Sequence, residues 1–436
     1  MKILIVSKLC SYPSWQGSAQ HARTFANLLV TNNIEIEMVS AEYIENYKSE
    51  NQDGYIIHKI PIKRNNDIVM NFTDILNNNF KNIAVKIIDN FKPDIIHVGV
   101  PTFVTDFIFY AKTKNIPIVA IVHSYEWFCM QKFLLKSNNQ ICDGPKLDKC
   151  IDCLIDYTGL KTQYLIKFTQ KFKFDFIKYF VSKKIHHKIS IKNRVKESLE
   201  KMNQVIHSIN LFLVQTPDSK KILNNIAIPN KKIEVLKQWL VDDKLRNNFI
   251  SQPGDILKFG YIGNLSYIKG VQIIFKALNA LDKKNKIELW ILSNGANKNK
   301  LEKLIGPLNK YNIKVKIFSN LQMNRDLPEK ISKLDICIVP SIWLEVGPRV
   351  LLEAIAQKVP CIASHTIGNK YLIKDDWNGK IFKSGDYFEL YNIINNIINN
   401  PGVITKWKNR LPNIRSKIEW YPEILSHHIN QIKNNE

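Results

Sequence analysis

The sequence predicts an α/β protein built from two doubly wound domains. Short apolar runs alternate with helix-like segments along most of the chain, as they do in parallel sheets covered by helices. The length of 436 residues suits two domains better than one, and 45% hydrophobic with 23% charged residues is ordinary for a globular protein. Ligands of such folds bind at the carboxyl ends of the strands, so we expect the active site in a cleft between the two domains.

The N-terminal domain is expected over residues 1–240. Residues 1–39 read as strand, loop, helix and strand, and the apolar run at their start is too short for a signal peptide. A cysteine-rich loop over 129–153 and a basic helical insert over about 160–205 interrupt the domain. Further buried strands are expected at Ile95–Val98, Ile118–Val122, Leu211–Val214 and Ile233–Leu236.

The C-terminal domain is expected over residues 257–405, after a connection that contains the turn residues Pro253 and Gly254. A helical tail over 406–436 is expected to return to the N-terminal domain. No segment approaches the length of a membrane span, so we expect a cytoplasmic protein. The expected strands are Phe259–Ile262, Ile287–Leu292, Val315–Phe318, Ile336–Val339 and Val359–Ala363.

The stretch from Asp335 to Ala363 carries the clearest chemical signal. Glu345 lies in a loop, Pro348 holds the expected first helical position, and Glu353 lies on the helix that follows. The start of a helix offers backbone N–H groups and a positive dipole end to a phosphate, and carboxylates beside it accept hydrogen bonds from sugar hydroxyls. The pattern suits a nucleoside diphosphate sugar. The i, i+4 spacing of Arg349 and Glu353 equally fits an ordinary surface ion pair.

The segment PSIWLEVGPRVLLEA resembles the Glu-x7-Glu signature of retaining glycosyltransferases of family 4, which have the GT-B fold. The resemblance implies two Rossmann-like domains facing across a cleft. It implies transfer of a sugar from a UDP- or GDP-sugar with retained configuration, and no metal in catalysis. Other segments similar to the family follow in the expected order: MKILIVSKLCSYPSWQGSAQHARTFANLL, KPDIIHVGV, IPIVAIVHSYEW, FGYIGNLSYIKGVQIIFKAL and DDWNGKIFKSGD.

The same resemblance implies roles for individual residues. The catalytic set is Glu345 on the donor sugar, Lys269 on the leaving diphosphate, and His123 near the donor sugar and the acceptor. The set that binds the nucleotide sugar is Gly17, Asn264, Arg349, Val350, Leu351 and Glu353, of which Glu353 contacts the ribose. The acceptor set is Tyr125, Glu126 and Trp127, which offer hydrogen bonding and stacking to a sugar.

Two positions depart from the family pattern. Family members often have two glycines in the first loop, and this chain has Gln16 before Gly17, so close backbone approach is available at only one of the two positions. An Arg usually assists the Lys at the diphosphate, and this chain has Asn264 at the matching position. Arg349 could substitute for that cation, or charge stabilisation is weaker, or the protein is not fully active.

Four cysteines follow His123 with the spacing C-x12-C-x7-C-x2-C. The closing C-x2-C pair has the spacing of a zinc knuckle, and in a reducing cytoplasm a metal is favoured over disulfides. We expect a structural zinc ion held by Cys129, Cys142, Cys150 and Cys153, with free buried thiols as the alternative. The remaining cysteines, Cys10, Cys337 and Cys361, lie in or beside expected strands and are predicted to be core residues.

The net charge is +23, and +9 of it lies between Lys161 and Lys201, where twelve Lys or Arg residues accompany three acidic ones. Aromatic side chains recur every four residues there, so they form one stripe on a helix flanked by lysines. Such a helix suits an anionic membrane surface, although the stripe could instead pack onto the N-terminal domain. No nucleic-acid-binding motif is present. The stripe consists of Tyr164, Phe168, Phe172, Phe176 and Phe180.

The sequence therefore predicts a glycosyltransferase that acts on a glycan or lipid-linked glycan in cell-surface polysaccharide synthesis. We expect it in the cytoplasm, peripherally on the inner face of the cell membrane. Two alternatives stay open. One is another GT-B enzyme such as a nucleotide-sugar epimerase, and the other is a non-catalytic glycan-binding subunit, which Asn264 and the single Gly17 favour.

Overall fold

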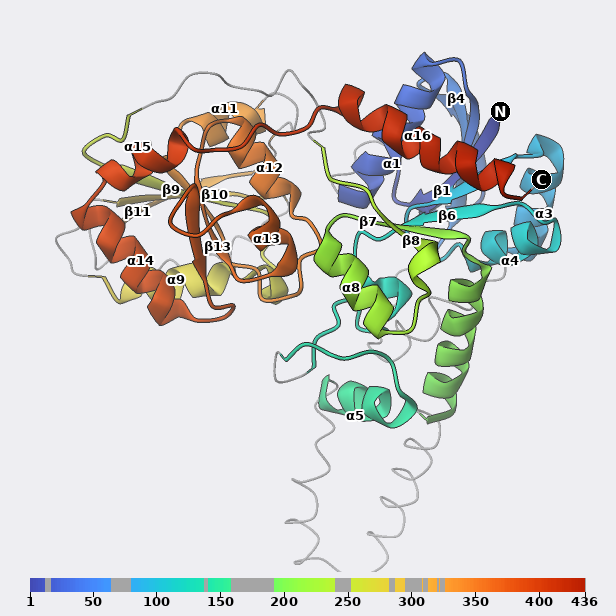
Figure 1. The fold of residues 1–436 in the computed structure, drawn as a ribbon, viewed down its shortest axis with the longest axis horizontal. Helices are drawn as coiled ribbons and strands as arrows, with labels where there is room; N and C mark the ends of the chain where they lie inside the picture. The colour runs from blue at the N-terminus through green and yellow to red at the C-terminus, as the bar shows by residue number, and fades with distance from the viewer. Residues whose placement is uncertain are drawn as a thin grey trace, which may run out of the picture. The chain divides into compact units, whose positions relative to one another are not determined.

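The structure is a computed structural model. It describes residues 1–11, 17–63, 80–136, 140–157, 192–239, 252–281, 287–294, 308, 313–319, 321 and 326–435. The chain forms two compact units, coloured from blue to red along the sequence in Figure 1. Unit 1 contains Met1–Val214, Lys220–Val235 and Ile424–Glu436, and unit 2 contains Gln215–Ser219 and Leu236–Glu423.

Unit 1 is built on an eight-stranded sheet with the order β3-β4-β2-β1-β5-β6-β7-β8. All pairings are parallel except the antiparallel pair of β3 and β4. Strand β1 has β2 on one side and β5 on the other, so the strand order reverses at β1. In open α/β sheets, ligands bind at the carboxyl ends of the strands beside such a reversal. The strands are β1 (Lys2–Lys8), β2 (Glu35–Glu42), β3 (Lys48–Gln52), β4 (Tyr55–Pro61), β5 (Ile95–Val98), β6 (Ile118–Ile121), β7 (Leu211–Val214) and β8 (Ile233–Val235).

The helices of unit 1 connect these parallel strands (Figure 1). Five residues of β1 are buried, because its run of apolar side chains is covered on both faces of the sheet. A further helix spans residues 192–208. The other helices are α1 (Gly17–Thr31), α3 (Lys81–Phe91), α4 (Thr105–Thr113), α5 (Leu147–Tyr157) and α8 (Pro217–Asn225), with short 3-10 turns η2 (Tyr125–Trp127) and η4 (Asn230–Lys232).

The β3–β4 hairpin was not predicted from the sequence. Its turn is Asp53-Gly54, with φ values of 54° and 90°, which is the conformation that Asp-Gly favours in a two-residue hairpin. Strand β3 is polar and mostly exposed at the edge of the sheet, so it lacks the alternating apolar pattern by which a strand is recognised.

Unit 2 is built on a six-stranded parallel sheet with the order β11-β10-β9-β12-β13-β14. The order reverses between β9 and β12. Strand β13 begins two residues later than predicted, after Pro360. The strands are β9 (Leu257–Ile262), β10 (Ile287–Leu292), β11 (Ile313–Phe318), β12 (Ile336–Val339), β13 (Cys361–Ser364) and β14 (Gly379–Phe382).

Helices cover both faces of this sheet, so a hydrophobic core lies on each face. Successive residues of a strand point alternately into one core and the other. Ile336 and Ile338 belong to the core that contains α9 and α14, whereas Cys337 and Val339 belong to the core that contains α11 and α12. The cysteines Cys10, Cys337 and Cys361 are buried, as the sequence predicts. The helices are α9 (Val271–Asn279), α11 (Asp326–Ser332), α12 (Arg349–Ala356), α13 (Ile367–Leu372), α14 (Tyr387–Asn399) and α15 (Gly402–Lys408), with the 3-10 turn η6 (Tyr267–Lys269).

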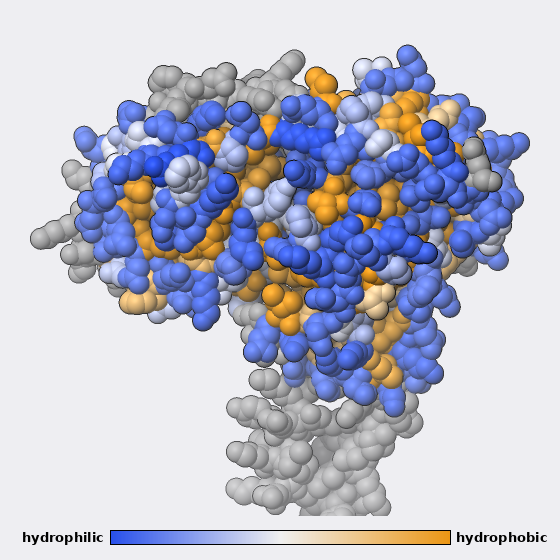
Figure 2. Space-filling view, in the orientation of Figure 1, coloured by the Kyte–Doolittle hydropathy of each residue, from blue (hydrophilic) through white to orange (hydrophobic). Residues whose placement is uncertain are grey.

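The last helix, α16 (Lys417–Lys433), contains Pro422 and carries the chain from unit 2 back to unit 1. In unit 1, its His428 ring lies 3.1 Å from the His97 ring, measured between Nε2 and Nδ1. Hydrophilic residues predominate on the face drawn in Figure 2. Among the described residues, no helix is both long and apolar enough to cross a membrane.

Candidate active site

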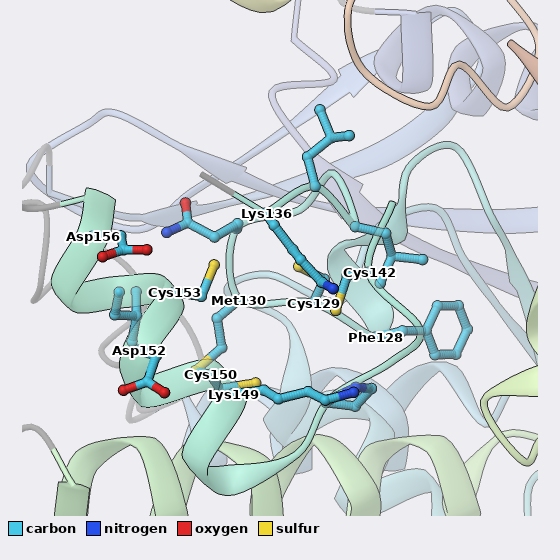
Figure 3. A pocket seen from close by; sticks show the side chains of 15 residues that line it. Phe128, Cys129, Met130, Lys136, Cys142, Lys149, Cys150, Asp152, Cys153 and Asp156 are labelled. Atoms are coloured by element: carbon cyan, nitrogen blue, oxygen red, sulfur yellow. The ribbon is translucent and has the colours of Figure 1, made fainter. Parts of the chain in front are cut away.

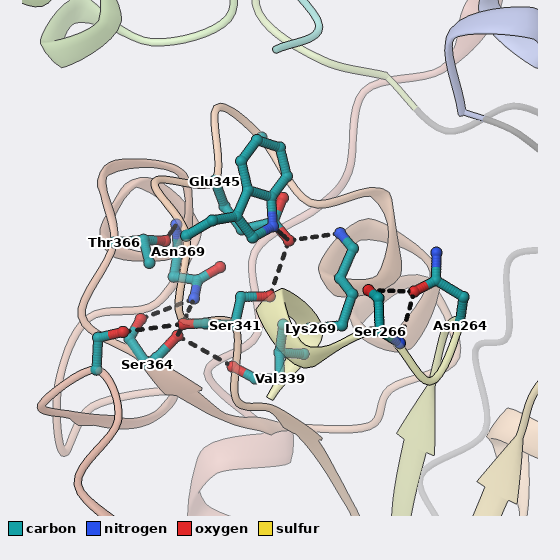
Figure 4. Close-up of polar contacts among 12 residues, drawn as sticks. Asn264, Ser266, Lys269, Val339, Ser341, Glu345, Ser364, Thr366 and Asn369 are labelled. Atoms are coloured by element: carbon teal, nitrogen blue, oxygen red, sulfur yellow. Dashed lines mark hydrogen bonds and ion pairs between the residues drawn. The ribbon is translucent and has the colours of Figure 1, made fainter. Parts of the chain in front are cut away.

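Glu345 of unit 2 has a buried carboxylate that side chains hold by hydrogen bonds. It lies in the loop after β12 and is only 4% exposed. Its Oε1 atom accepts three hydrogen bonds: from Lys269 Nζ at 2.7 Å, from Ser341 Oγ at 2.8 Å and from Trp343 Nε1 at 2.8 Å (Figure 4). A buried carboxylate is stable only with such partners, so this position is built to hold a negative charge.

Lys269 reaches Glu345 from the loop after β9, the strand beside β12. Gly270 follows it with φ of 75°, and a Cβ atom on Gly270 would lie 1.9 Å from the Pro340 carbonyl oxygen. Only glycine fits there, and it brings the two loops into contact. The Lys269 ammonium also lies 5.0 Å from the centre of the Trp343 ring. The structure thus brings together two of the residues that the sequence predicted as catalytic.

A polar network below Glu345 fixes the path of its loop. Ser364 Oγ donates to the Ser341 carbonyl at 2.6 Å, and Asn369 Nδ2 donates to the Ser364 carbonyl at 2.7 Å (Figure 4). The amide of Gly368 donates to the Glu345 carbonyl at 2.9 Å, and a Cβ atom on Gly368 would lie 2.8 Å from that oxygen. These supporting residues were not predicted from the sequence, because most of their partners are distant in the chain.

Helix α12 begins one residue later than predicted, so Pro348 is its N-cap and Arg349 its first residue. The Leu351 amide donates to the Pro348 carbonyl at 3.1 Å and is therefore engaged. The Val350 amide makes no hydrogen bond within the described part of the chain. It is the backbone donor that the helix start offers to an anion.

Glu353 lies one turn further along α12 and is half-buried. Burial raises the pKa of its carboxyl group, and the positive charge of Arg349 opposes that shift. Asn264 is exposed, and its Oδ1 atom accepts hydrogen bonds from the backbone amide of Ser266 at 3.2 Å and from its hydroxyl at 2.6 Å. The side-chain carbonyl of Asn264 thus stabilises the loop in which it lies.

In unit 1, His123 follows β6 and packs edge-on against His21 of α1, with ring centres 4.8 Å apart. His21 in turn stacks on His97 of β5 at 6.1 Å. These ring contacts, which were not predicted from the sequence, position His123 at the carboxyl end of the sheet. Gly17 is the exposed first residue of α1, and the preceding Gln16 lies outside the described residues.

The three predicted acceptor residues differ in burial. Tyr125 is fully buried and Trp127 is 2% exposed, with its ring edge-on against Phe212 at 5.6 Å. Both rings therefore pack in the core of unit 1, and the expectation that they stack on an acceptor is not met. Glu126 alone stays near the surface, because the η2 turn points it away from the core.

The four predicted metal ligands, Cys129, Cys142, Cys150 and Cys153, line one cavity of about 290 Å³ between α5 and the loop before it (Figure 3). Burial raises the pKa of the Cys129 thiol, and the nearby backbone of Leu134, Gln131 and Phe133 opposes that shift. Burial raises the pKa of Cys150 to about 11 and that of Cys153 to about 12. In the described ranges, no three His, Cys, Asp or Glu side chains are arranged to hold one ion without movement.

The predicted aromatic stripe from Tyr164 to Phe180 lies outside the described residues. The structure describes only the C-terminal part of the basic insert, as the helix at 192–208.

Two parallel-sheet units with these strand orders define the GT-B fold of glycosyltransferases, and solved structures agree over the whole chain. Sucrose-phosphate synthase from Thermosynechococcus elongatus is 12% identical with a TM-score of 0.69, covering 100% of both chains. HepE from Anabaena in complex with UDP is 13% identical with a TM-score of 0.62, covering 99% of this chain and 100% of its own. The predicted fold class is confirmed.

The sequence comparisons agree with this class. Residues 243–414 match the family described as "Glycosyl transferases group 1". A UDP-Gal:alpha-D-GlcNAc-diphosphoundecaprenol alpha-1,3-galactosyltransferase from Escherichia coli is 31% identical over 74 residues, 17% of this chain and 19% of its own. An uncharacterized glycosyltransferase from Methanocaldococcus jannaschii is 26% identical over 169 residues, 38% of this chain and 42% of its own. The chain is thus similar in fold to GT-B glycosyltransferases along its whole length, and residues 243–414 are similar in sequence to the group 1 family.

Proposed function

We propose that this protein transfers a sugar from a nucleoside diphosphate sugar to a glycan or lipid-linked glycan, with retention of configuration, in cell-surface polysaccharide synthesis. One observation carries the proposal. The buried carboxylate of Glu345 and the ammonium of Lys269 are paired where the strand order of unit 2 reverses. Open α/β sheets bind their ligands at that place.

Two relatives indicate the substrate class. HepE has been crystallised with UDP and with UDP-glucose. The name of the Escherichia coli relative gives UDP-galactose as the donor and a lipid diphosphate sugar as the acceptor. A UDP- or GDP-sugar donor and a lipid-linked acceptor are therefore the first candidates for this chain.

The proposed chemistry uses the residues of unit 2 in separate roles. Breaking the bond between sugar and diphosphate develops positive charge on the anomeric carbon and negative charge on the diphosphate. Lys269, Arg349 and the Val350 amide would neutralise the diphosphate, so the side chains supply this charge in place of a metal. Glu345 would bind hydroxyls of the donor sugar, and Glu353 would bind the ribose. The acceptor hydroxyl would then attack the anomeric carbon from the face that the leaving group departs, and its proton would pass to the oxygen of the leaving diphosphate.

His123 in unit 1 is proposed to contact the acceptor or the donor sugar. Its place at the end of β6 and its packing against His21 support this role. Glu126 is the remaining candidate for a hydrogen bond to the acceptor.

Asn264 and the single Gly17 favour the alternative of a non-catalytic glycan-binding subunit, because Asn264 leaves one cation fewer at the diphosphate, and a GT-B epimerase is the other alternative. A donor screen followed by turnover distinguishes the three functions. Thermal shift with UDP- and GDP-sugars should show one donor that raises the melting temperature, since a ligand of the folded state stabilises it. Transfer to an acceptor supports the proposal, reaction of the donor alone supports an epimerase, and binding without any reaction supports a binding subunit.

Two further proposals concern parts of unit 1 outside the reaction. The four cysteines are proposed to hold one structural zinc ion, because all four line the same cavity and the last two have the spacing of a zinc knuckle. Binding would draw the four sulfurs together around the ion. The basic insert is proposed to dock the protein on the inner face of the membrane, beside a lipid-linked acceptor.

A further inference from the structure

A group of polar side chains lies at the carboxyl ends of three neighbouring strands of unit 1, and the proposed reaction uses only one of them, Glu126. Lys8 ends β1, Thr102 follows β5, and Glu126 and Lys132 follow β6. The reversal of strand order at β1 brings these strand ends together, so the group lies where open α/β sheets bind ligands.

Lys8 is the unusual member of this group. Its ammonium lies 4.7 Å from the centre of the Phe103 ring and 5.8 Å from that of Tyr43. Within the described residues it has no hydrogen-bond acceptor and no carboxylate within ion-pair distance. The pKa of Lys8 is lowered to about 8, first by burial and then by the charge of Lys132, while the charge of Glu126 opposes the shift. A partly buried ammonium held only by aromatic rings lacks the oxygen atoms that normally solvate it.

Both carboxylate oxygens of Glu126 already have partners. Its Oε1 atom accepts from Ser124 Oγ at 3.0 Å, and its Oε2 atom accepts from Thr102 Oγ1 at 3.3 Å and lies 3.8 Å from Lys132 Nζ. The backbone fixes Lys132 in this place, because its carbonyl accepts from the Tyr125 amide at 3.1 Å. Only Lys132, of the two lysines, lies within ion-pair distance of Glu126. The group thus contains one carboxylate and two ammonium groups and carries an excess positive charge.

We propose that Lys8 and Lys132 bind a phosphate or diphosphate group of the acceptor. An anion between the two ammonium groups would supply the oxygen acceptors that Lys8 lacks and would relieve the repulsion between the lysines. Tyr43, 41% exposed, and Phe103 would flank the bound group. This inference rests on the proposed glycosyltransferase function and names its acceptor class: a sugar linked to phosphate, either on a lipid diphosphate or as a soluble sugar phosphate.

Inorganic pyrophosphate is the first probe, measured by calorimetry with saturating UDP so that the nucleotide site of unit 2 is filled. Lys8→Gln and Lys132→Gln should each weaken the remaining pyrophosphate binding about tenfold, the effect of losing one charge-assisted contact. Lys8→Arg should retain it, and the exposed Lys112→Gln should not change it. Unchanged pyrophosphate binding in both Gln variants, with parent-like melting temperatures, would overturn the proposal.

Steady-state kinetics then identify the source of the phosphate. Lys8→Gln should raise the KM for a phosphate-bearing acceptor and leave the donor KM unchanged. A larger effect with a short-chain lipid diphosphate sugar than with a sugar 1-phosphate assigns the lipid-linked acceptor, and the reverse assigns the soluble one. A rise in the donor KM alone would show that the lysines serve the donor and would contradict the inference. If pyrophosphate binds as expected and no transfer occurs with any acceptor, the anion site stands and the proposed function fails.

Discussion

Lys269 Nζ lies 2.7 Å from Glu345 Oε1, although the two residues are separated by 76 positions in the chain. The Glu345 side chain is 5% exposed and the Lys269 side chain 30% exposed, so the carboxylate depends on this cation more than the cation depends on the carboxylate. We infer that the pair is the resting state of the site. When a donor binds, the ammonium would turn to the diphosphate while Ser341 and Trp343 keep their bonds to Glu345.

The first prediction concerns this ion pair. Lys269→Ala should lower kcat on the order of a hundredfold, because it removes about 3 kcal/mol of charge stabilisation at the leaving group. It should also lower the melting temperature, since it leaves Glu345 buried without a cation. Steady-state kinetics and thermal unfolding measure the two effects.

Three variants serve as controls for that prediction. Adding Glu345→Gln to Lys269→Ala should restore part of the stability and none of the activity, because the unpaired charge is removed. Lys276→Ala, at an exposed lysine of α9, should leave both unchanged. Asn264→Arg should retain or increase activity by restoring the second cation. Parent-like activity of Lys269→Ala would show that the leaving-group assignment is wrong.

The second prediction concerns Glu353 and pH. Its folded-state pKa is raised by burial, so the folded protein binds this proton more tightly than the unfolded chain does. The proton on Glu353 therefore stabilises the folded protein fully at pH values below the unfolded-state pKa. This stabilisation is lost as pH rises through the folded-state pKa. Glu353→Gln should raise the free energy of unfolding at neutral pH while raising the donor KM, because it removes a desolvated charge and a ribose contact.

The pH profile of Glu353→Gln provides the check. In the parent, the donor KM should increase as pH falls toward the raised pKa, and in Glu353→Gln this dependence should be absent. Glu345→Gln should lower kcat instead, since Glu345 is proposed to bind the donor sugar. If Glu353→Gln had parent donor kinetics at every pH, Glu353 would be a structural residue only.

Much of this architecture was predictable because buried parallel strands have continuous apolar runs. Ile336–Val339 was predicted with its observed bounds, whereas the polar edge strand Lys48–Gln52 was missed because it has no buried face. Motif resemblance predicted both Glu345 and Lys269 as site residues. It did not predict Ser341 or Trp343, whose role is to donate hydrogen bonds to Glu345. Trp127 was misjudged, because an aromatic residue after a strand suits an acceptor site and a core equally well.

The third prediction is the metal. Protein purified under reducing conditions should contain about one zinc ion per chain, as a closed four-cysteine site requires. Cys150→Ser and Cys153→Ser should lose the zinc and lower the melting temperature, while Cys337→Ser, in the core of unit 2, should keep it. Elemental analysis that finds no metal in the parent would support free thiols instead.

The fourth prediction concerns the membrane surface. The protein should bind anionic vesicles, and binding should weaken with added salt, because each lysine near the surface contributes about 1 kcal/mol and is screened. Replacing Phe168, Phe172 and Phe176 with Ser should abolish vesicle binding without changing donor binding. A parent protein that ignores anionic vesicles, or a triple variant that unfolds because the rings are core residues, would contradict the membrane proposal.

The most direct test of the central claim is the product of the reaction itself. The parent protein is incubated with the donor that stabilises it and with a lipid-linked glycan acceptor, and the product is examined by mass spectrometry and NMR. We predict release of the nucleoside diphosphate that depends on the acceptor, addition of one sugar with retained anomeric configuration, and loss of both in Glu345→Gln. Donor binding without transfer to any acceptor, or conversion of the donor without an acceptor, would contradict the assignment.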